Sequence, residues 1–200
     1  MSASPAKPRH YFDKKFEIEA VRILPGEYYA TNQNRMIATT LGSCVAACIR
    51  DSKSGIGGMN HFMLPDTGQD NSGWGSSSTR YGAYAMEMLI NQLLKMGALR
   101  SQLEAKLFGG GAVIEQMKTI NVGERNAKFG LDYLQTEGIP LISNDLLDIY
   151  PRRVYFFPQT GRVLVKKIYG LHNEAIFSRE QNYNSRLQKN DVAGDIELFS

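Results

Sequence analysis

The sequence predicts a single domain that folds as a mixed α+β sandwich. Predicted strands outnumber predicted helices, and the two do not alternate regularly, which argues against a doubly wound parallel sheet. The chain has 200 residues, and a typical domain holds about 100–150 residues. Its hydrophobic content of 42% and charged content of 22% are ordinary for a soluble globular protein that buries a sizeable core.

Charge and cysteine content exclude several classes of protein. The net charge of +3 is spread along the chain, so no dense basic run predicts nucleic-acid binding. No apolar stretch approaches the ~18 residues that would predict membrane insertion, and the first residues lack the apolar segment of a secretory signal. Two cysteines only four positions apart are not a disulfide framework. We therefore expect a reduced, cytoplasmic protein.

The first half of the chain predicts strands joined by turns. Residues 17–23 alternate in polarity as a half-buried strand does, and residues 28–31 predict a short strand. Two apolar runs, residues 45–49 and 56–64, flank a polar, turn-rich segment and predict a β-hairpin. Residues 66–78 are rich in Gly, Ser and Asp and predict a long surface loop.

The second half predicts two helices and further strands. Leu89 and Leu93 belong to an apolar face with spacings of three and four, which predicts a helix over residues 79–96. Asn121 and Glu124 are spaced as in a capping box and predict the start of a second helix. The remaining predicted elements are a strand at 104–108, one or two strands within 141–150, and a hairpin formed by 154–157 and 162–168.

The predicted hairpin brings a thiol and an imidazole together. If Asp51 pairs with Ser54, Cys44 lies directly opposite His61, with Cβ atoms roughly 4.5–5.5 Å apart on one face. A slip of one residue would place them on opposite faces. A histidine beside a cysteine accepts the thiol proton and later protonates a leaving group.

Small residues beside the cysteine predict the rest of an acyl-transfer site. Gly42 and Ser43 leave backbone N–H groups accessible, and such donors form an oxyanion hole. Gly109 and Gly110 would let a substrate chain approach closely. The alternative is structural: a buried cysteine is most often a small hydrophobic residue, and a lone histidine is more often structural than catalytic.

Two other kinds of site find little support. One histidine and two cysteines in this segment fall short of a closed four-ligand zinc site. The glycine run at 109–111 lacks the Gly-Lys-Ser/Thr ending of a phosphate loop. We therefore expect neither a metal nor a cofactor.

Several phrases, in order, resemble the CheD family of bacterial chemotaxis proteins, which are chemoreceptor glutamine deamidases. They are LGSCVAACIRD, GGMNHFMLP, LLKMGA, EAKLFGGGA and INVGERN. The resemblance implies that Cys44 is the catalytic cysteine and His61 the catalytic histidine of a protein-glutamine glutaminase. The family often has a catalytic threonine six residues before the cysteine, but Ala38 stands there. Thr39 or Thr40 is then the candidate third member.

The resemblance also implies a fold and partners. The family fold is similar to that of the cytotoxic necrotizing factor deamidase toxins, a mixed β/β/α sandwich. The resemblance covers residues 21–169, which are the expected domain. From their polar composition, we expect residues 1–20 to be a partly flexible extension and residues 170–200 to be a polar tail. The implied substrate is the cytoplasmic helices of methyl-accepting chemoreceptors. A CheC-type phosphatase of the response regulator is a further implied partner.

Two alternatives to the deamidase function remain open at the level of sequence. The chain can be a binding module that regulates a CheC-type phosphatase, with Cys44 and His61 left as structural residues. It can also be a related acyl-transfer enzyme in which an amine replaces water as the acceptor.

Overall fold

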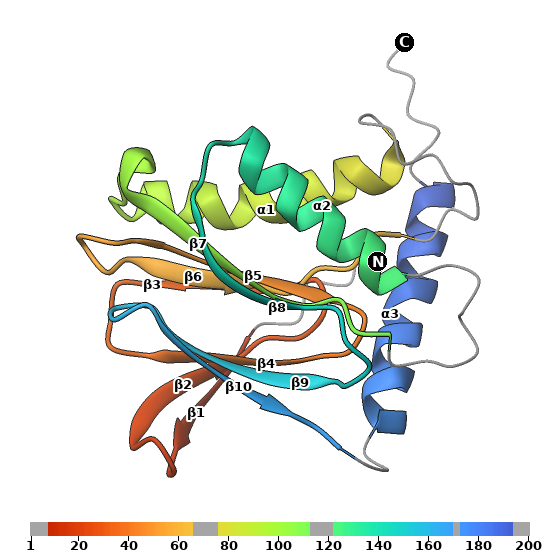
Figure 1. Cartoon of the computed structure of the whole chain (residues 1–200), viewed down its shortest axis with the longest axis horizontal. Coiled ribbons are helices and arrows are strands. Elements are labelled where there is room, and N and C mark those ends of the chain that lie inside the picture. Colours follow the sequence, from red (N-terminus) through yellow and green to blue (C-terminus); the bar gives the residue numbers. More distant parts are fainter. Residues whose placement is uncertain (1–7, 66–75, 113–121, 170–172, 194–200) are drawn as a thin grey trace.

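The computed structural model describes residues 8–65, 76–112, 122–169 and 173–193. Two five-stranded sheets lie face to face, and helices α1 (Ser77–Lys95) and α2 (Val122–Thr136) cover the outer face of one of them (Figure 1). A third helix, α3 (Asn173–Ala193), stands across the ends of both sheets (Figure 1). The arrangement confirms the predicted α+β sandwich.

Sheet A is the layer farther from α1 and α2, and its strand order is β1-β2-β4-β9-β10. Its second and third strands run parallel, and its other neighbouring strands are antiparallel. The strands of sheet A are β1 (Arg9–Asp13), β2 (Ile18–Arg22), β4 (Met36–Leu41), β9 (Arg152–Phe157) and β10 (Arg162–Lys167).

Sheet B lies in the middle of the three layers, and its order is β3-β6-β5-β7-β8. Its central strand, VAACIRD, is apolar on both faces because helices cover one face and sheet A covers the other. Only its last two strands pair in parallel. The strands of sheet B are β3 (Tyr28–Thr31), β5 (Val45–Asp51), β6 (Gly57–Asn60), β7 (Leu103–Gly109) and β8 (Leu141–Leu146).

Two apolar cores result from this layering. Between the helices and sheet B, Leu89 and Leu93 of α1 pack with Ile49 of β5. Between the two sheets, Cys48 of β5 packs in a cluster with Val154 of β9. Alternate residues of β5 therefore enter different cores, as the two-residue period of a strand requires. Cys44 belongs to the core between the sheets.

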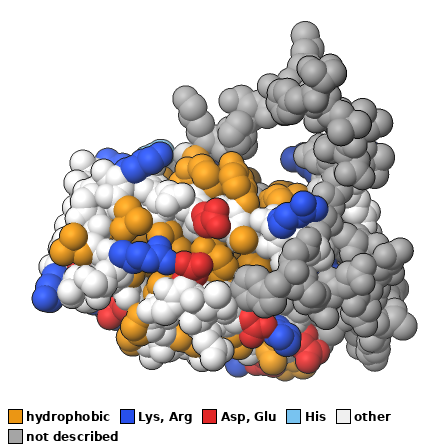
Figure 2. All heavy atoms as spheres, turned by 90° about the horizontal axis from the view of Figure 1, so that it is seen from above, with side chains coloured by type: hydrophobic (Ala, Val, Ile, Leu, Met, Phe, Trp, Pro, Cys, Tyr) orange, Lys and Arg blue, Asp and Glu red, His pale blue; other side chains and the backbone are white. Residues whose placement is uncertain are grey.

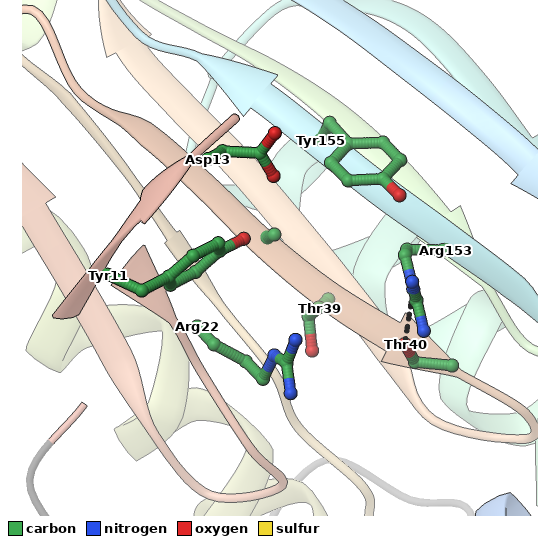
Figure 3. Close-up of a pocket in the computed structure, with 8 residues that line it drawn as sticks. Tyr11, Asp13, Arg22, Thr39, Thr40, Arg153 and Tyr155 are labelled. Atoms are coloured by element: carbon green, nitrogen blue, oxygen red, sulfur yellow. Dashed lines mark hydrogen bonds between the residues drawn. The ribbon is translucent and has the colours of Figure 1, made fainter. Parts of the chain in front are cut away.

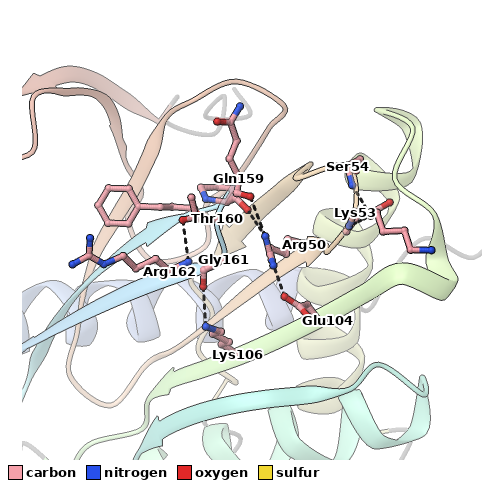
Figure 4. Close-up of polar contacts among 12 residues, drawn as sticks. Arg50, Lys53, Ser54, Glu104, Lys106, Gln159, Thr160, Gly161 and Arg162 are labelled. Atoms are coloured by element: carbon pink, nitrogen blue, oxygen red, sulfur yellow. Dashed lines mark hydrogen bonds and ion pairs between the residues drawn. The ribbon is translucent and has the colours of Figure 1, made fainter.

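Polar contacts join the two sheets at the end away from α3 (Figure 4). Arg50 of β5 forms an ion pair with Glu104 of β7 at 2.7 Å and donates to the carbonyl of Gln159 at 3.0 Å. Lys106 of β7 donates to the carbonyl of Gly161 at 2.8 Å. These contacts hold the β9–β10 turn of sheet A against sheet B.

The hairpin register differs from the predicted one by two residues. Cys48 pairs with Met59, so Cys44 and His61 are not directly opposed and that prediction is wrong. The loop is longer than predicted because the Asp51 carboxylate accepts hydrogen bonds from two N–H groups within it. A shift of two residues preserves the face of every side chain, so the thiol and the imidazole still share the face toward sheet A.

Two strands and one α-helix were not predicted from the sequence. β1 lies in a segment whose polar composition suggested little order, and β4 lies in a segment to which no element was assigned. α3 lies in the segment predicted as a polar tail, and its polar composition hid a sparse apolar face. Most of the predicted loop at 66–78 lies outside the described residues. The boundaries 1–20, 21–169 and 170–200 stay predictions.

The surface over α1 and α2 mixes residue types. Figure 2 shows hydrophobic side chains there between scattered acidic and basic ones. Tyr84 of α1 and Leu131 of α2 are among the exposed hydrophobic residues of the chain. Among the described residues, no helix is both long enough and apolar enough to cross a membrane.

Candidate active site

The candidate active site lies where the chain crosses from sheet A to sheet B. β4 ends at Leu41, β5 begins at Val45, and the crossing residues are Gly42, Ser43 and Cys44. The thiol of Cys44 is fully buried. A short crossing at a sheet end leaves successive N–H groups outside the ladders, where they can bind another acceptor.

His61 lies directly after β6, and hydrogen bonds of its backbone hold it in place. Its N–H donates to the carbonyl of Glu27 at 3.0 Å, and its own carbonyl accepts from the N–H of Gly26 at 2.7 Å. The side chain is only 1% exposed. The imidazole is therefore fixed by the segment that precedes β3, and it points toward sheet A.

Thr39 of β4 fixes the tautomer of His61. Its Oγ1 lies 2.7 Å from Nδ1 of His61 and 2.9 Å from the carbonyl oxygen of Ile23. A carbonyl only accepts, so the single hydroxyl proton goes to Ile23 and Oγ1 accepts from Nδ1–H. Nε2 then keeps its lone pair, and it has no hydrogen-bond partner in the described part of the chain. A lone pair on Nε2 is what a general base needs.

Of the two candidate threonines, the structure brings only Thr39 to the imidazole. Thr40 is partly exposed, and its hydroxyl accepts a hydrogen bond from Arg153 at 3.4 Å. Adjacent residues of a strand point to opposite faces. Ala38, at the family's threonine position, is therefore on the wrong face as well.

Glu180 of α3 also lies in the site, and sequence reasoning missed it. Its Oε1 accepts from the N–H groups of Gly42 (2.8 Å) and Cys44 (3.3 Å). Its Oε2 accepts from the N–H and the hydroxyl of Ser43 at 2.8 and 2.7 Å. The carboxylate thus occupies the group of N–H donors predicted as an oxyanion hole. The sequence did contain one signal for it: Ile176, Glu180 and Leu187 are spaced so that they fall on one face of a helix.

Three potential ligand atoms meet at this point. One atom each of Cys44, His61 and Glu180 lie within 4.8 Å of one another. Both oxygens of Glu180 already accept hydrogen bonds from the crossing residues. The carboxylate of Glu180 is therefore already satisfied by the protein itself, and a thiol, an imidazole and a carboxylate together also suit acyl transfer.

Burial keeps the reactive groups neutral in this state. It raises the pKa of the Cys44 thiol well above its ordinary value, and the negative charge and hydrogen bonding of Glu180 raise it further. Burial lowers the pKa of His61 from 6.5 to about 3, and the charge of Arg179 acts in the same direction. Both shifts follow from removing water from groups that would carry charge.

Residues of β7 and α2 hold the crossing segment from behind. Asn126 is fully buried and donates to the carbonyl of Ser43 at 2.9 Å. The N–H of Gly110 donates to the carbonyl of Cys44 at 2.8 Å. Gly109 has a φ of 111°, and a Cβ there would lie 2.2 Å from the same carbonyl oxygen. These glycines therefore allow the chain's own backbone at Cys44 to approach closely. That they also let a substrate approach stays a prediction.

A separate concavity lies on the outer face of sheet A (Figure 3). Its wall carries Tyr11, Arg22, Arg153 and Tyr155, with Thr40 at one side. Neither the thiol of Cys44 nor the imidazole of His61 lines it. The candidate chemistry therefore lies beneath α3 and not in this concavity.

Comparisons with known proteins identify the family of the chain. The family model described as CheD chemotactic sensory transduction matches residues 63–167. A protein of Dechloromonas aromatica called probable chemoreceptor glutamine deamidase CheD 1 is 61% identical over 94% of this chain and 93% of its own. Two further relatives are called probable chemoreceptor glutamine deamidase CheD. The protein of Herminiimonas arsenicoxydans is 60% identical over 95% of this chain and 94% of its own. The protein of Laribacter hongkongensis is 51% identical over 99% of this chain and 96% of its own. The chain belongs to the CheD family.

Proposed function

We propose that this chain deamidates glutamine side chains of chemoreceptors through a thioester on Cys44. The observation that carries the proposal is the convergence of three N–H groups on one carboxylate beside the thiol and the imidazole. Close relatives named as chemoreceptor glutamine deamidases support it. The implied substrate is a glutamine on a cytoplasmic receptor helix.

The first half of the reaction forms the thioester. Nε2 of His61 takes the thiol proton, and the Cys44 sulfur attacks the side-chain amide carbon. The N–H groups of residues 42–44 donate to the oxyanion, which is the largest single contribution in many acyl transfers. His61 then returns the proton to the departing nitrogen, the C–N bond breaks, and ammonia leaves.

The second half restores the enzyme. Nε2 of His61 takes a proton from water, the hydroxide oxygen attacks the thioester carbon, and the C–S bond breaks. The sulfur recovers the proton from His61, and the product is a glutamate side chain. Thr39 keeps Nδ1 protonated throughout, so Nε2 is the nitrogen that moves protons.

Mass spectrometry of a receptor cytoplasmic fragment tests the proposal. Wild-type protein should convert glutamine to glutamate, and Cys44→Ala should not. Cys48→Ala is the matched control, because Cys48 is an equally buried thiol four residues away and should leave conversion intact. Conversion by Cys44→Ala would exclude Cys44 as the nucleophile. Absence of conversion by the wild type would exclude the deamidase function for that receptor.

The resemblance supports a second proposal, that the chain binds a CheC-type phosphatase. Stimulation of the phosphatase by Cys44→Ala as strongly as by the wild type would separate binding from catalysis. Incorporation of an added primary amine into the receptor in place of water would instead identify an acyl transferase.

A further inference from the structure

The face that α3 turns toward the body is a narrow apolar stripe interrupted by one acid. Ile176, Glu180, Tyr183 and Leu187 follow one another at intervals of four, three and four residues, which places them on one helical face. Ile176 and Leu187 are each 7% exposed, and Glu180 is 2% exposed. Most other described side chains of α3 are exposed. A buried carboxylate inside an apolar stripe requires specific partners.

Side chains above and below Glu180 hold α3 in place. Tyr183 packs against the core between the sheets, and its hydroxyl contacts that of Tyr81 on α1. The ring of Tyr183 fills the space beside Gly26, where a Cβ would meet it. A small crevice remains between α3 and the body, lined on the body side by Ser43, Met63 and Val122. The body thus presents a surface that accepts one helix.

Glu180 lies where the product of the proposed reaction would lie. Its carboxylate accepts four hydrogen bonds from residues 42–44, beside Cys44 and His61. A glutamate side chain on a helix is also what a deamidated receptor glutamine becomes. The chain therefore holds, in its own site, the functional group that its reaction would generate.

We propose that α3 is an intramolecular product mimic that occupies the binding surface for the receptor helix and holds the enzyme at rest. This inference rests on the proposed deamidase function. It also specifies the substrate: a helix whose target glutamine is flanked by apolar residues four positions before it and three and seven positions after it. A receptor helix is modified only after α3 has left the surface.

The electrostatics of the site agree with a resting state. The carboxylate of Glu180 beside Cys44 disfavours the thiolate, and burial beneath α3 disfavours the charged forms of both reactive groups. Departure of α3 admits water and removes the negative charge. Tethering gives α3 an effective concentration on the order of mM, so a receptor helix has to compete with a helix that is always present.

Substitution of Glu180 by glutamine in the full-length chain tests the mimic directly. Glu180→Gln restores an amide at the position of the product, so the chain should convert its own residue 180 to glutamate. Mass spectrometry of the α3 peptide follows the conversion. Gln181 is an internal control, because it is exposed on the same helix and should stay unchanged. Adding Cys44→Ala should abolish conversion, and the rate should not depend on protein concentration.

A second variant tests the resting state without requiring self-conversion. Glu180→Ala removes the charge-assisted hydrogen bonds that hold α3, so receptor deamidation and alkylation of Cys44 should both accelerate about 10-fold. Glu174→Ala is the matched control, because Glu174 is an exposed acid on the same helix. It should change neither rate.

The outcomes separate this inference from the proposed function. If residue 180 of Glu180→Gln stays glutamine while the same preparation converts receptor glutamines, α3 is not a product mimic but the deamidase function stands. If neither is converted, the deamidase function fails and the inference fails with it. Unchanged receptor and alkylation rates in Glu180→Ala would overturn the resting role of α3.

Discussion

Thr39 of sheet A and His61, which directly follows β6 of sheet B, meet through a 2.7 Å hydrogen bond between Oγ1 and Nδ1. The hydroxyl of Thr39 donates its proton to the carbonyl of Ile23. The hydrogen bond between Thr39 and His61 therefore requires the imidazole proton to lie on Nδ1. One contact between the sheets thus decides which ring nitrogen can act as a base. The geometry of the sandwich and the chemistry of the site are linked at this point.

Replacement of Thr39 should therefore act on catalysis more than on binding. Thr39→Val keeps the shape but removes the acceptor for Nδ1–H, so both tautomers become populated. We expect kcat for receptor deamidation to fall by about 10²-fold, the lower end of what general acid–base help contributes, with little change in KM. Thr40→Val, on the outer face, is the control. A larger loss of kcat in Thr40→Val would reject this assignment.

The buried imidazole should make the protein sensitive to acid. The pKa of His61 is about 3 in the folded state and 6.5 when exposed to water, so the unfolded chain binds the extra proton between these values. The stability that the buried neutral imidazole contributes is fully present above pH 6.5. It is lost as the pH falls toward 3, and the free energy of unfolding decreases by an amount on the order of a few kcal/mol.

Urea unfolding between pH 7 and pH 4 measures this effect. His61→Asn cannot titrate, so its free energy of unfolding should decline less steeply with falling pH than that of the wild type. His10→Asn removes an exposed histidine of β1 and serves as the control substitution. Equal slopes for His61→Asn and the wild type would show that His61 is not buried in its neutral form.

Gly109 should tolerate substitution much less than Gly138 does. Both have positive φ, 111° and 64°, and a Cβ in such a conformation costs about 1–2 kcal/mol. At Gly138 nothing lies within 4 Å of the added Cβ, whereas at Gly109 the Cys44 carbonyl oxygen lies at 2.2 Å. Gly109→Ala should lower the free energy of unfolding by about 3 kcal/mol or more. Similar losses in the two variants, measured by urea unfolding, would argue against this close approach.

Arg152 should be essential for stability although it lies outside the site. Its side chain is fully buried in β9, and Nη1 lies 2.7 Å from the carboxylate of Asp145. It also donates to the carbonyl of Leu147, just after β8. Arg152→Met leaves these acceptors unpaired, and we expect a loss of about 3–5 kcal/mol in urea unfolding. Arg153→Met, at the exposed neighbour, should change stability by less than about 1 kcal/mol.

The sequence by itself determined most of the local elements and the candidate reactive residues. Apolar spacing predicted α1, and the spacing of Asn121 and Glu124 predicted the start of α2. Alternation, apolar runs and turn residues predicted most strands, and the phrases around Cys44 and His61 pointed to the family. These features depend on residues that are close in the chain, where periodicity and turn chemistry act directly. The two sheets, by contrast, are assembled from strands that are distant in sequence, and local patterns do not specify those pairings.

Only the tertiary structure decided how the site is completed. Two neighbouring threonines look alike in sequence, but the pleat of β4 turns Thr39 toward His61 and Thr40 toward Arg153. Glu180 lies 136 residues beyond Cys44 in a helix whose polar composition predicted a tail. Its role depends on where α3 packs, because a carboxylate is stabilised in a buried position only when folding brings N–H donors to it.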